Sequence, residues 1–188
     1  MVNVYDFDKT IYDGDSTLDF YFFEIKKDLF LIRYFPKQFF YVILYSLKLI
    51  NKDKLKECFF CFIKGINNLE KEVELFWKFN KNKIKKWYLS QKLENDIVIS
   101  ASPEWLLKPI ICDDLGLKLI ATKVNPKTGY LESLNCYGEE KVKRFEKEMA
   151  NVKIQNFYSD SISDISMARK SDNAWLVDKN KIEKWNFN

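Results

Sequence analysis

Two aspartates lie two residues apart directly after a short apolar run near the start of the chain. The run VNVY at residues 2–5 is followed by Asp6, Asp8 and Thr10 in the pattern D-x-D-x-T. If the strand continues, its period of two places both carboxylates on the same side. Two acids this close are costly unless a cation or a shared proton relieves their repulsion. The alternative is structural, because Asp and Thr also cap turns.

Polar residues also follow three later segments, in an order that suggests a common site. They are Ser100, Ser102, Lys141, Asp160 and Asp164. Taken singly, the serines and aspartates are compatible with helix capping, and the lysine with an exposed helix face. Side chains at the carboxyl ends of strands in an open α/β sheet, however, face the crevice where such folds bind ligands. Their occurrence at successive strand exits therefore favours a shared site.

The chain has 188 residues and no histidine. This excludes Ser-His-Asp and Cys-His nucleophile systems and histidine-ligated metal sites. Acid–base chemistry must come from carboxylates, Lys, Tyr or Cys. Cys58 and Cys61 have C-x-x-C spacing but lie in an apolar helical stretch, so we expect buried side chains rather than metal ligands.

The elements expected to position these residues are strands alternating with helices. Strands are expected at residues 96–100, 117–122, 154–158 and 174–177, with a helix starting at Pro103 as its first residue. Such alternation indicates a parallel sheet. The predicted fold is α/β, with a Rossmann-like core formed by residues 1–13 and 93–188.

Residues 14–92 read as an all-helical cap inserted after the first strand. An N-cap signal occurs at residues 15–17, and another helix is expected to start at residues 51–53. Asn67 or Asn68 is expected to cap the last helix, which should run to about residue 93. Residues 21–92 contain sixteen Lys and Arg against seven Asp and Glu, while the whole chain is only +4. A basic cap over an acidic crevice suits a phosphate substrate and a metal ion, although solvated helix faces account for some of the lysines.

The longest uncharged apolar-rich run in the aromatic part of the cap, residues 38–47, is about half of what a membrane-spanning helix requires. No signal peptide is visible, so we expect a cytoplasmic protein. The basic run at residues 81–86 is weak support for nucleic-acid binding, and no nucleic-acid partner is expected.

Together these motifs resemble those of the haloacid dehalogenase-like superfamily, specifically the phosphoserine phosphatase-like branch (subfamily IB) with a helical cap. The resemblance covers essentially the whole chain. D-x-D-x-T at residues 6–10 matches the first motif, and VISASP at residues 98–103 looks like the second. Residues 138–142 look like the lysine motif, and YSDSISD at residues 158–164 looks like the acidic fourth motif.

The resemblance implies a Mg²⁺-dependent phosphatase. Asp6 would be the nucleophile that forms an aspartyl-phosphate, and Asp8 would be the general acid and then the base. Mg²⁺ would be held by Asp6, the backbone carbonyl of Asp8 and Asp160, with Asp164 as a further ligand or a support for the others. The phosphate-binding residues would be Thr10, Ser100, Ser102 and Lys141.

Several departures from the branch bear on the substrate. Ala101 and Ser102 replace the usual glycine pair, so either serine is a candidate for the phosphate. The branch's substrate-reading glutamate corresponds to Asp15, one methylene shorter, and Arg33 is a candidate for a substrate-binding arginine of the cap. These departures weigh against phosphoserine as the substrate.

The aromatic and basic cap suggests an amphiphilic or lipid phosphomonoester and a peripheral membrane contact through the cap. The simpler alternative is that the cap packs its aromatic side chains internally. Phosphoserine or another small metabolite remains an alternative substrate. Two other classes are a phosphorelay receiver domain, disfavoured by the large helical insert, and a non-catalytic protein that binds a phosphorylated ligand.

Overall fold

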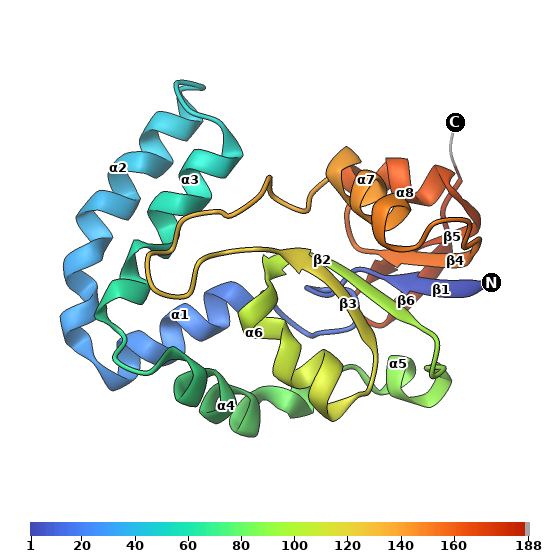
Figure 1. Cartoon of the computed structure of the whole chain (residues 1–188), viewed down its shortest axis with the longest axis horizontal. Coiled ribbons are helices and arrows are strands. Elements are labelled where there is room, and N and C mark those ends of the chain that lie inside the picture. The colour runs from blue at the N-terminus through green and yellow to red at the C-terminus, as the bar shows by residue number, and fades with distance from the viewer. Residues whose placement is uncertain (187–188) are drawn as a thin grey trace.

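The computed structural model describes residues 1–186, which fold around a six-stranded sheet of order β3-β2-β1-β4-β5-β6 (Figure 1). Its strands are β1 (Val2–Tyr5), β2 (Ile97–Pro103), β3 (Lys118–Thr122), β4 (Ile154–Ser159), β5 (Ser171–Asp178) and β6 (Lys181–Lys184). Strands β1 to β5 pair in parallel, and β6 pairs antiparallel with β5. The carboxyl ends of the parallel strands therefore meet at one edge of the sheet.

The central strands are apolar because helices and loops cover both faces of the sheet. Val4 and Val98 are fully buried, and they point into two different core clusters. Near-continuous apolar runs are typical of parallel strands buried on both sides. The predicted α/β fold is confirmed.

The helices that follow β2 are α6 (Glu104–Lys108), which continues into a π-helical segment (Pro109–Asp114), α7 (Glu139–Glu148) and α8 (Ile165–Arg169), preceded by a 3-10 turn (Ile162–Asp164). The expectation that Pro103 would be the first residue of a helix was wrong. Pro103 is the last residue of β2, with an extended ψ of 137°, and it pairs with Thr122 after a shift in register. The helix begins one residue later.

All the regular elements between β1 and β2 are helical. They are α1 (Ser16–Lys27), a 3-10 helix (Leu29–Tyr34), α2 (Phe35–Ser46), α3 (Lys52–Phe59), a 3-10 helix (Phe60–Gly65), α4 (Leu69–Asn80), a 3-10 turn (Lys81–Lys83) and α5 (Lys86–Gln91). The expected helix starts are confirmed: within residues 15–17 and 51–53 the caps are Asp15 and Asn51, and of the two candidates Asn67 and Asn68 it is Asn68 that caps α4. Each of the three side chains accepts a backbone N–H of the following helix.

These helices do not share one environment. Helices α1 and α4 pack onto the sheet side of the molecule: Phe20 and Phe76 belong to the same core cluster as Phe7 and Leu106. Helices α2 and α3 instead lie side by side at the left of Figure 1, at the end of the molecule away from β4 and β5.

The expected continuous helix to about residue 93 was wrong, because the chain becomes extended between α4 and α5. Ile84 forms an antiparallel bridge with Tyr12. The N–H of Asp13 donates to the carbonyl of Lys83 (2.9 Å), and the N–H of Lys85 donates to the carbonyl of Ile11 (2.8 Å). The chain segments that enter and leave the helical insert thus pair with each other beside the end of β1. No helix among the described residues is long and apolar enough to cross a membrane.

Candidate active site

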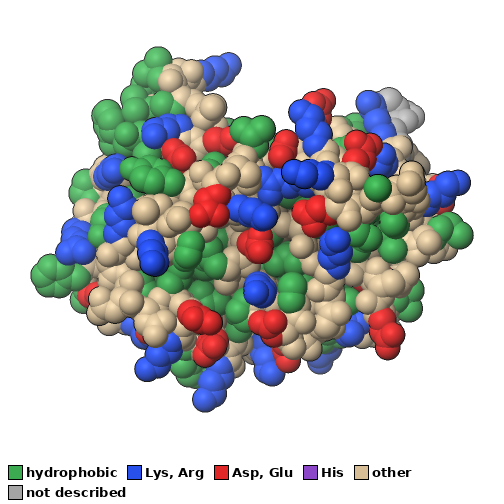
Figure 2. All heavy atoms as spheres, in the orientation of Figure 1, with side chains coloured by type: hydrophobic (Ala, Val, Ile, Leu, Met, Phe, Trp, Pro, Cys, Tyr) green, Lys and Arg blue, Asp and Glu red, His purple; other side chains and the backbone are tan. Residues whose placement is uncertain are grey.

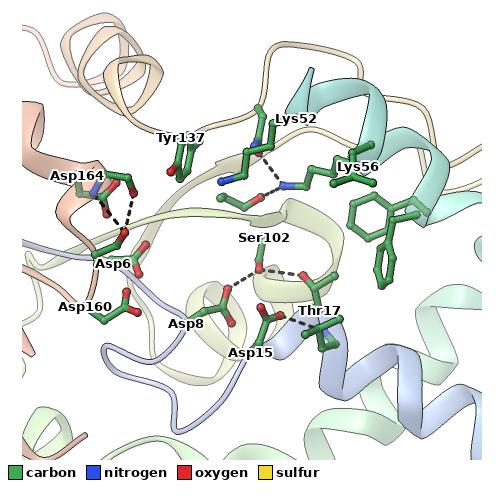
Figure 3. Close-up of a pocket in the computed structure, with 18 of the residues that line it drawn as sticks. Asp6, Asp8, Asp15, Thr17, Lys52, Lys56, Ser102, Tyr137, Asp160 and Asp164 are labelled. Carbon is green, nitrogen blue, oxygen red and sulfur yellow. Dashed lines mark hydrogen bonds between the residues drawn. The ribbon is translucent and has the colours of Figure 1, made fainter. Parts of the chain in front are cut away.

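A cavity of about 420 Å³ opens at the carboxyl ends of β1, β2 and β4 (Figure 3). From β1 the chain adds β2 and then β3 on one side of the sheet, and β4 and β5 are added on the other side of β1. The direction in which strands are added therefore reverses at the β1–β4 pair. Ligands of open α/β sheets bind at such a reversal. Asp6 and Asp8 follow β1, and Asp160 follows β4, and all three line the cavity.

Asp6 is held on both carboxylate oxygens. Its Oδ1 accepts a hydrogen bond from the Lys141 ammonium at 2.6 Å, and its Oδ2 accepts one from the Thr10 hydroxyl at 3.3 Å. The same Lys141 ammonium also donates to Oδ2 of Asp164 at 2.7 Å. Lys141 lies in the first turn of α7, so the position of this helix fixes one positive charge between two carboxylates.

This group of charges is almost completely buried. Burial alone would lower the pKa of Lys141, but the carboxylates of Asp6 and Asp164 offset burial and raise the pKa above the ordinary lysine value. Burial raises the pKa of Asp6, and the Lys141 ammonium opposes this shift. The Lys141 ammonium, only 2.6 Å away, favours the ionised form of Asp6.

Asp8 has a different environment, in which its carboxylate accepts hydrogen bonds from a hydroxyl group and from a backbone N–H. Its Oδ2 accepts the Ser102 hydroxyl at 2.5 Å, and its Oδ1 accepts the backbone N–H of Ser16, in the first turn of α1, at 2.6 Å. Burial raises the pKa of Asp8 to about 6, Asp15 adds to the shift, and the two hydrogen bonds oppose it. Asp8 is therefore an acid that titrates near the range where proton transfer at neutral pH is effective.

The two serines of β2 are placed differently. Ser102 lines the cavity, and its hydroxyl also lies 2.9 Å from that of Thr17. Ser100 is buried behind it, where its hydroxyl accepts the backbone N–H of Ser102. Thr10 is fully buried too, and its hydroxyl accepts the N–H of Asp160 at 2.9 Å. Ser102 and Lys141 thus reach the cavity wall, while Thr10 and Ser100 support the residues that do.

Asp160 and Asp164 complete the acidic side of the cavity. Asp164 accepts the Ser159 hydroxyl on Oδ2, whereas its buried Oδ1 has no hydrogen-bond partner among residues 1–186. Burial raises the pKa of Asp160, Lys9 opposes the shift and Asp164 adds to it. These carboxylates carry more negative charge than the Lys141 ammonium alone can neutralise.

The oxygen donors of this region fit a hard cation such as Mg²⁺. No three Cys, Asp or Glu side chains in the described part of the chain are grouped as a complete metal site. Mg²⁺ does not need such a group, because it retains several waters and binds through one or two carboxylates together with substrate phosphate. The unpartnered buried oxygen of Asp164 is consistent with a cation at this position.

Of the two candidate specificity residues, only Asp15 lines the cavity. Asp15 lines the cavity at the N-terminus of α1, where its Oδ1 accepts the N–H of Leu18 at 3.0 Å. Arg33 is exposed in the 3-10 helix before α2, and its guanidinium donates to the Tyr34 hydroxyl. It does not line the cavity. The structure brings Asp15 to the site and leaves Arg33 away from it.

Sequence reasoning missed two cationic residues of α3 that line the cavity. The Lys56 ammonium donates to Oδ1 of Asn135 at 2.7 Å and to the carbonyl of Ala101. Burial lowers the pKa of Lys56 to about 8, against the attraction of Asp8. Lys52 lies one turn earlier, with its ammonium 3.2 Å from the ring centroid of Tyr137. Their i,i+4 spacing was the available signal, since it places both on one helix face.

The inserted helices supply the apolar part of the cavity wall. The residues concerned are Leu18 of α1, Val42 of α2, Leu55 and Phe59 of α3, and Phe60. Figure 3 shows Thr17 and Lys56 on the opposite side of the view from Asp6 and Asp164. The acids therefore come from the strand ends, and the apolar surface comes from the insert.

Solved structures with the same fold span nearly the whole chain. A protein of unknown function from Bordetella pertussis Tohama I is 19% identical, with a TM-score of 0.69 over 89% of this chain and 85% of that one. A phosphoserine phosphohydrolase-like protein from Francisella tularensis subsp. tularensis SCHU S4 is 15% identical, with a TM-score of 0.60 over 93% and 86%. At such identities the likeness shows a shared fold.

No curated protein matches the chain in sequence. The sequence pattern of the haloacid dehalogenase-like hydrolases, in contrast, matches residues 4–169. The matched region runs from β1 to α8 and contains every residue described above as lining the cavity. The chain therefore belongs to the haloacid dehalogenase-like hydrolase family.

Proposed function

We propose that the protein is a phosphomonoester phosphatase that acts through an aspartyl-phosphate intermediate. The observation that carries this proposal is the pair Asp6 and Asp8, two carboxylates in one cavity with different environments. Asp6 is paired with an ammonium group, whereas Asp8 is held by Ser102 and by the N-terminus of α1. Carboxylates whose environments differ in this way are typical of a nucleophile and a general acid acting together.

In the first step Asp6 attacks phosphorus, and the bond from phosphorus to the leaving oxygen breaks. Asp8 donates its proton to that oxygen, so that an alcohol leaves rather than an alkoxide. In the second step Asp8 removes a proton from the water that attacks the aspartyl-phosphate, and inorganic phosphate is released with Asp6 restored. Lys141 keeps Asp6 ionised and oriented, and Ser102 orients Asp8.

Asp6, the backbone carbonyl of Asp8 and Asp160 would hold Mg²⁺, with Asp164 beside them. When bound, the ion supplies positive charge that reduces the repulsion between an anionic phosphate and an anionic nucleophile. The phosphoserine phosphohydrolase-like protein from Francisella tularensis, which shares this fold, supports phosphatase chemistry here.

We propose further that the substrate carries an apolar group next to its phosphate, as in an amphiphilic or lipid phosphomonoester. The apolar side chains of α1, α2 and α3 support this class, since they face the same cavity as the acids. Arg33 does not line the cavity, so it supplies no support for phosphoserine recognition. Octyl phosphate should have a kcat/KM at least about tenfold above that of ethyl phosphate, because each buried methylene contributes about 0.8 kcal/mol. Equal values would contradict an apolar-group preference.

The decisive experiment is steady-state hydrolysis of p-nitrophenyl phosphate with Mg²⁺ and with EDTA. Asp6→Asn should abolish turnover, because an amide cannot form the acyl phosphate. Asp172→Asn, a change at an exposed position of β5, is the matched control and should behave as the wild type. Full activity of Asp6→Asn would refute the mechanism. Phosphate binding without turnover of p-nitrophenyl, alkyl or lipid phosphates would instead identify a phospho-ligand binding protein.

A further inference from the structure

Helix α2 buries a polar residue and exposes apolar ones, the reverse of an ordinary surface helix. Gln38 is its one buried residue, and the whole helix is described. The Gln38 side chain accepts the Tyr21 hydroxyl at 2.5 Å and donates to the carbonyl of Phe59 at 2.8 Å. Surface helices normally bury an apolar stripe and expose polar residues. Here a polar residue fixes the inner face, and apolar residues face solvent.

Several exposed apolar side chains follow one another along α2 rather than occurring at scattered positions. We define the α2 surface by Phe30, Phe35, Phe39, Phe40, Ile43 and Leu47, all of them exposed. Phe35, Phe39, Ile43 and Leu47 follow each other at intervals of four, which places them along one side of the helix. The rings of Phe35 and Phe39 stack with centroids 6.1 Å apart. An exposed apolar patch of this kind marks an interaction site.

The charged residues within the segment that carries this surface all have one sign. Residues 29–52 contain Arg33, Lys37, Lys48 and Lys52 and no Asp or Glu, and acidic residues occur next at Asp28 and Asp53. Figure 2 shows hydrophobic side chains gathered over the α2 end of the molecule, with Lys and Arg side chains among and around them. An apolar face fringed by basic groups is the composition of helices that lie in the interface of anionic membranes.

The geometry points to an anionic lipid bilayer as the occupant of the α2 surface. The apolar side chains of α2 enter the boundary between headgroups and acyl chains, and the basic residues of the segment contact anionic headgroups. A second copy of the chain is the weaker candidate. A self-complementary contact would bring the same basic residues together without acidic partners from residues 29–52, which is unfavourable.

Docking through the α2 surface would place the cavity close to the bilayer, because α2 also contributes to the cavity wall. Val42 lines the cavity and is itself 47% exposed, so α2 belongs to both surfaces. A phosphomonoester in the headgroup layer then reaches the cavity beside α2 without leaving the membrane completely. This last step rests on the proposed phosphatase function, whereas docking does not.

The test is co-sedimentation with vesicles of phosphatidylcholine alone and with about 30% phosphatidylglycerol, at low and high salt. Phosphatidylglycerol is anionic, but it is a phosphodiester and so is not a substrate of the proposed phosphomonoesterase. Binding to these vesicles is therefore measured separately from turnover. The wild type should bind the anionic vesicles at low salt, and binding should weaken as salt increases. The double variant F39S/I43S should bind at least about tenfold more weakly, because two interfacial apolar side chains are lost.

Phe79→Ser is the matched control, since Phe79 is an equally large and exposed residue on α4, at 63% against 55% for Phe39. It should bind as the wild type. Asp6→Asn should also bind normally, which separates docking from turnover. The proposal is overturned if the wild type ignores anionic vesicles, or if F39S/I43S binds as well as Phe79→Ser. It is equally overturned if light scattering finds a dimer that F39S/I43S dissociates and no vesicle binding.

Discussion

At the scale of single residues, Asp8 is held so that it can both give and take a proton. One oxygen accepts the Ser102 hydroxyl and the other accepts the N–H of Ser16. These bonds favour the charged form, whereas burial favours the neutral form and raises the pKa to about 6. The balance keeps either state accessible near neutral pH.

We predict that Asp8→Asn separates the two halves of the reaction. With p-nitrophenyl phosphate, whose leaving group needs no proton, Asp6 should still be phosphorylated. Hydrolysis of the intermediate should stall because no base activates water, with a loss on the order of 10²–10⁴ in the steady-state rate. Rapid mixing should show a burst of one p-nitrophenolate per enzyme. A steady state without a burst would argue against Asp8 as the base of the second step.

Lys56 gives the site a pH dependence of its own. Burial lowers its pKa to about 8 in the folded protein, against about 10.4 in an unfolded chain. Between these values the unfolded chain binds more protons, so this residue's contribution makes stability rise with pH. Urea unfolding between about pH 8 and 10.4 should show this rise in the wild type relative to Lys56→Met.

Lys54→Met is the control for Lys56, because Lys54 is exposed on the same helix and its pKa is raised by Glu57 rather than lowered by burial. It should not remove the rise. Above about pH 8 the cavity also loses positive charge, so the KM for an anionic substrate should increase in the wild type and stay level in Lys56→Met. A parallel pH profile for the two proteins would contradict the assignment.

At the scale of elements, the loop between β3 and α7 is fitted closely against the helical insert. Gly129 has a φ of +76°, and a Cβ built there would lie 2.8 Å from the carbonyl carbon of Phe60. The hydroxyl of Thr122, at the end of β3, lies 2.7 Å from the carbonyl oxygen of Ala101 and 2.9 Å from Oδ1 of Asn135. These are the same two oxygens that accept hydrogen bonds from the Lys56 ammonium. The loop is therefore one wall of the cavity and one contact of the insert.

Gly129→Ala should cost about 1–3 kcal/mol of unfolding free energy, because the left-handed backbone is strained and the methyl group meets the Phe60 backbone. Gly116→Ala is a matched control with a φ of +69° and no atom within 4 Å of the new Cβ. It should lose only the strain contribution, about 1 kcal/mol. Chemical denaturation measures both, and equal losses would show that contact with Phe60 is unimportant.

Local signals in the sequence predicted local structure well and long-range contacts poorly. Helices α1, α3 and α4 begin at the expected starts in residues 15–17, 51–53 and 67–68, since capping depends on the next three residues. The break at Ile84 was missed because its partner, Tyr12, is far away in sequence. Strand β6 was missed as well, since its four residues pair with β5 through a turn in which Lys179 has a positive φ.

In the site, too, residues placed by local elements were predicted, and residues placed by tertiary packing were not. The acidic residues were predicted to converge because strand ends of a parallel sheet meet at one edge, and the cavity contains Asp6, Asp8 and Asp160. Lys56 and Asn135 were not predicted, because only the packing of α3 against the loop of residues 123–138 brings them together. A tertiary contact of this kind leaves no periodic signal in the sequence.

At the scale of the whole molecule, charge is distributed unevenly. Residues 21–92 carry sixteen basic and seven acidic residues, whereas the complete chain is only +4. Lys52 and Lys56 bring part of this excess to the cavity that contains the acids. A positive field at the entrance increases the local concentration of anionic substrates.

We predict that kcat/KM for a soluble dianionic phosphomonoester falls several-fold as salt rises from about 0.02 to about 0.3 M, with little change in kcat. Lys52→Gln should flatten this dependence, because it removes a charge at the cavity. Lys81→Gln, which removes an exposed lysine paired with Asp114, should leave the slope near that of the wild type. Steady-state assays across a salt series measure this dependence. If kcat/KM of the wild type does not change with salt, substrate steering is refuted.

The pairing of the segments that enter and leave the helical insert has a consequence for how this architecture diversifies. Because Tyr12 and Ile84 lie side by side, the two ends of the insert are already held together beside the end of β1. Doubling the length of a loop closed at its ends costs only about 0.6 kcal/mol in closure entropy. Helices remote from that junction, such as α2 and α3, are therefore free to lengthen, shorten or change sequence while the strand ends keep their geometry. The helices that line the cavity can then change without altering the carboxylates at the strand ends.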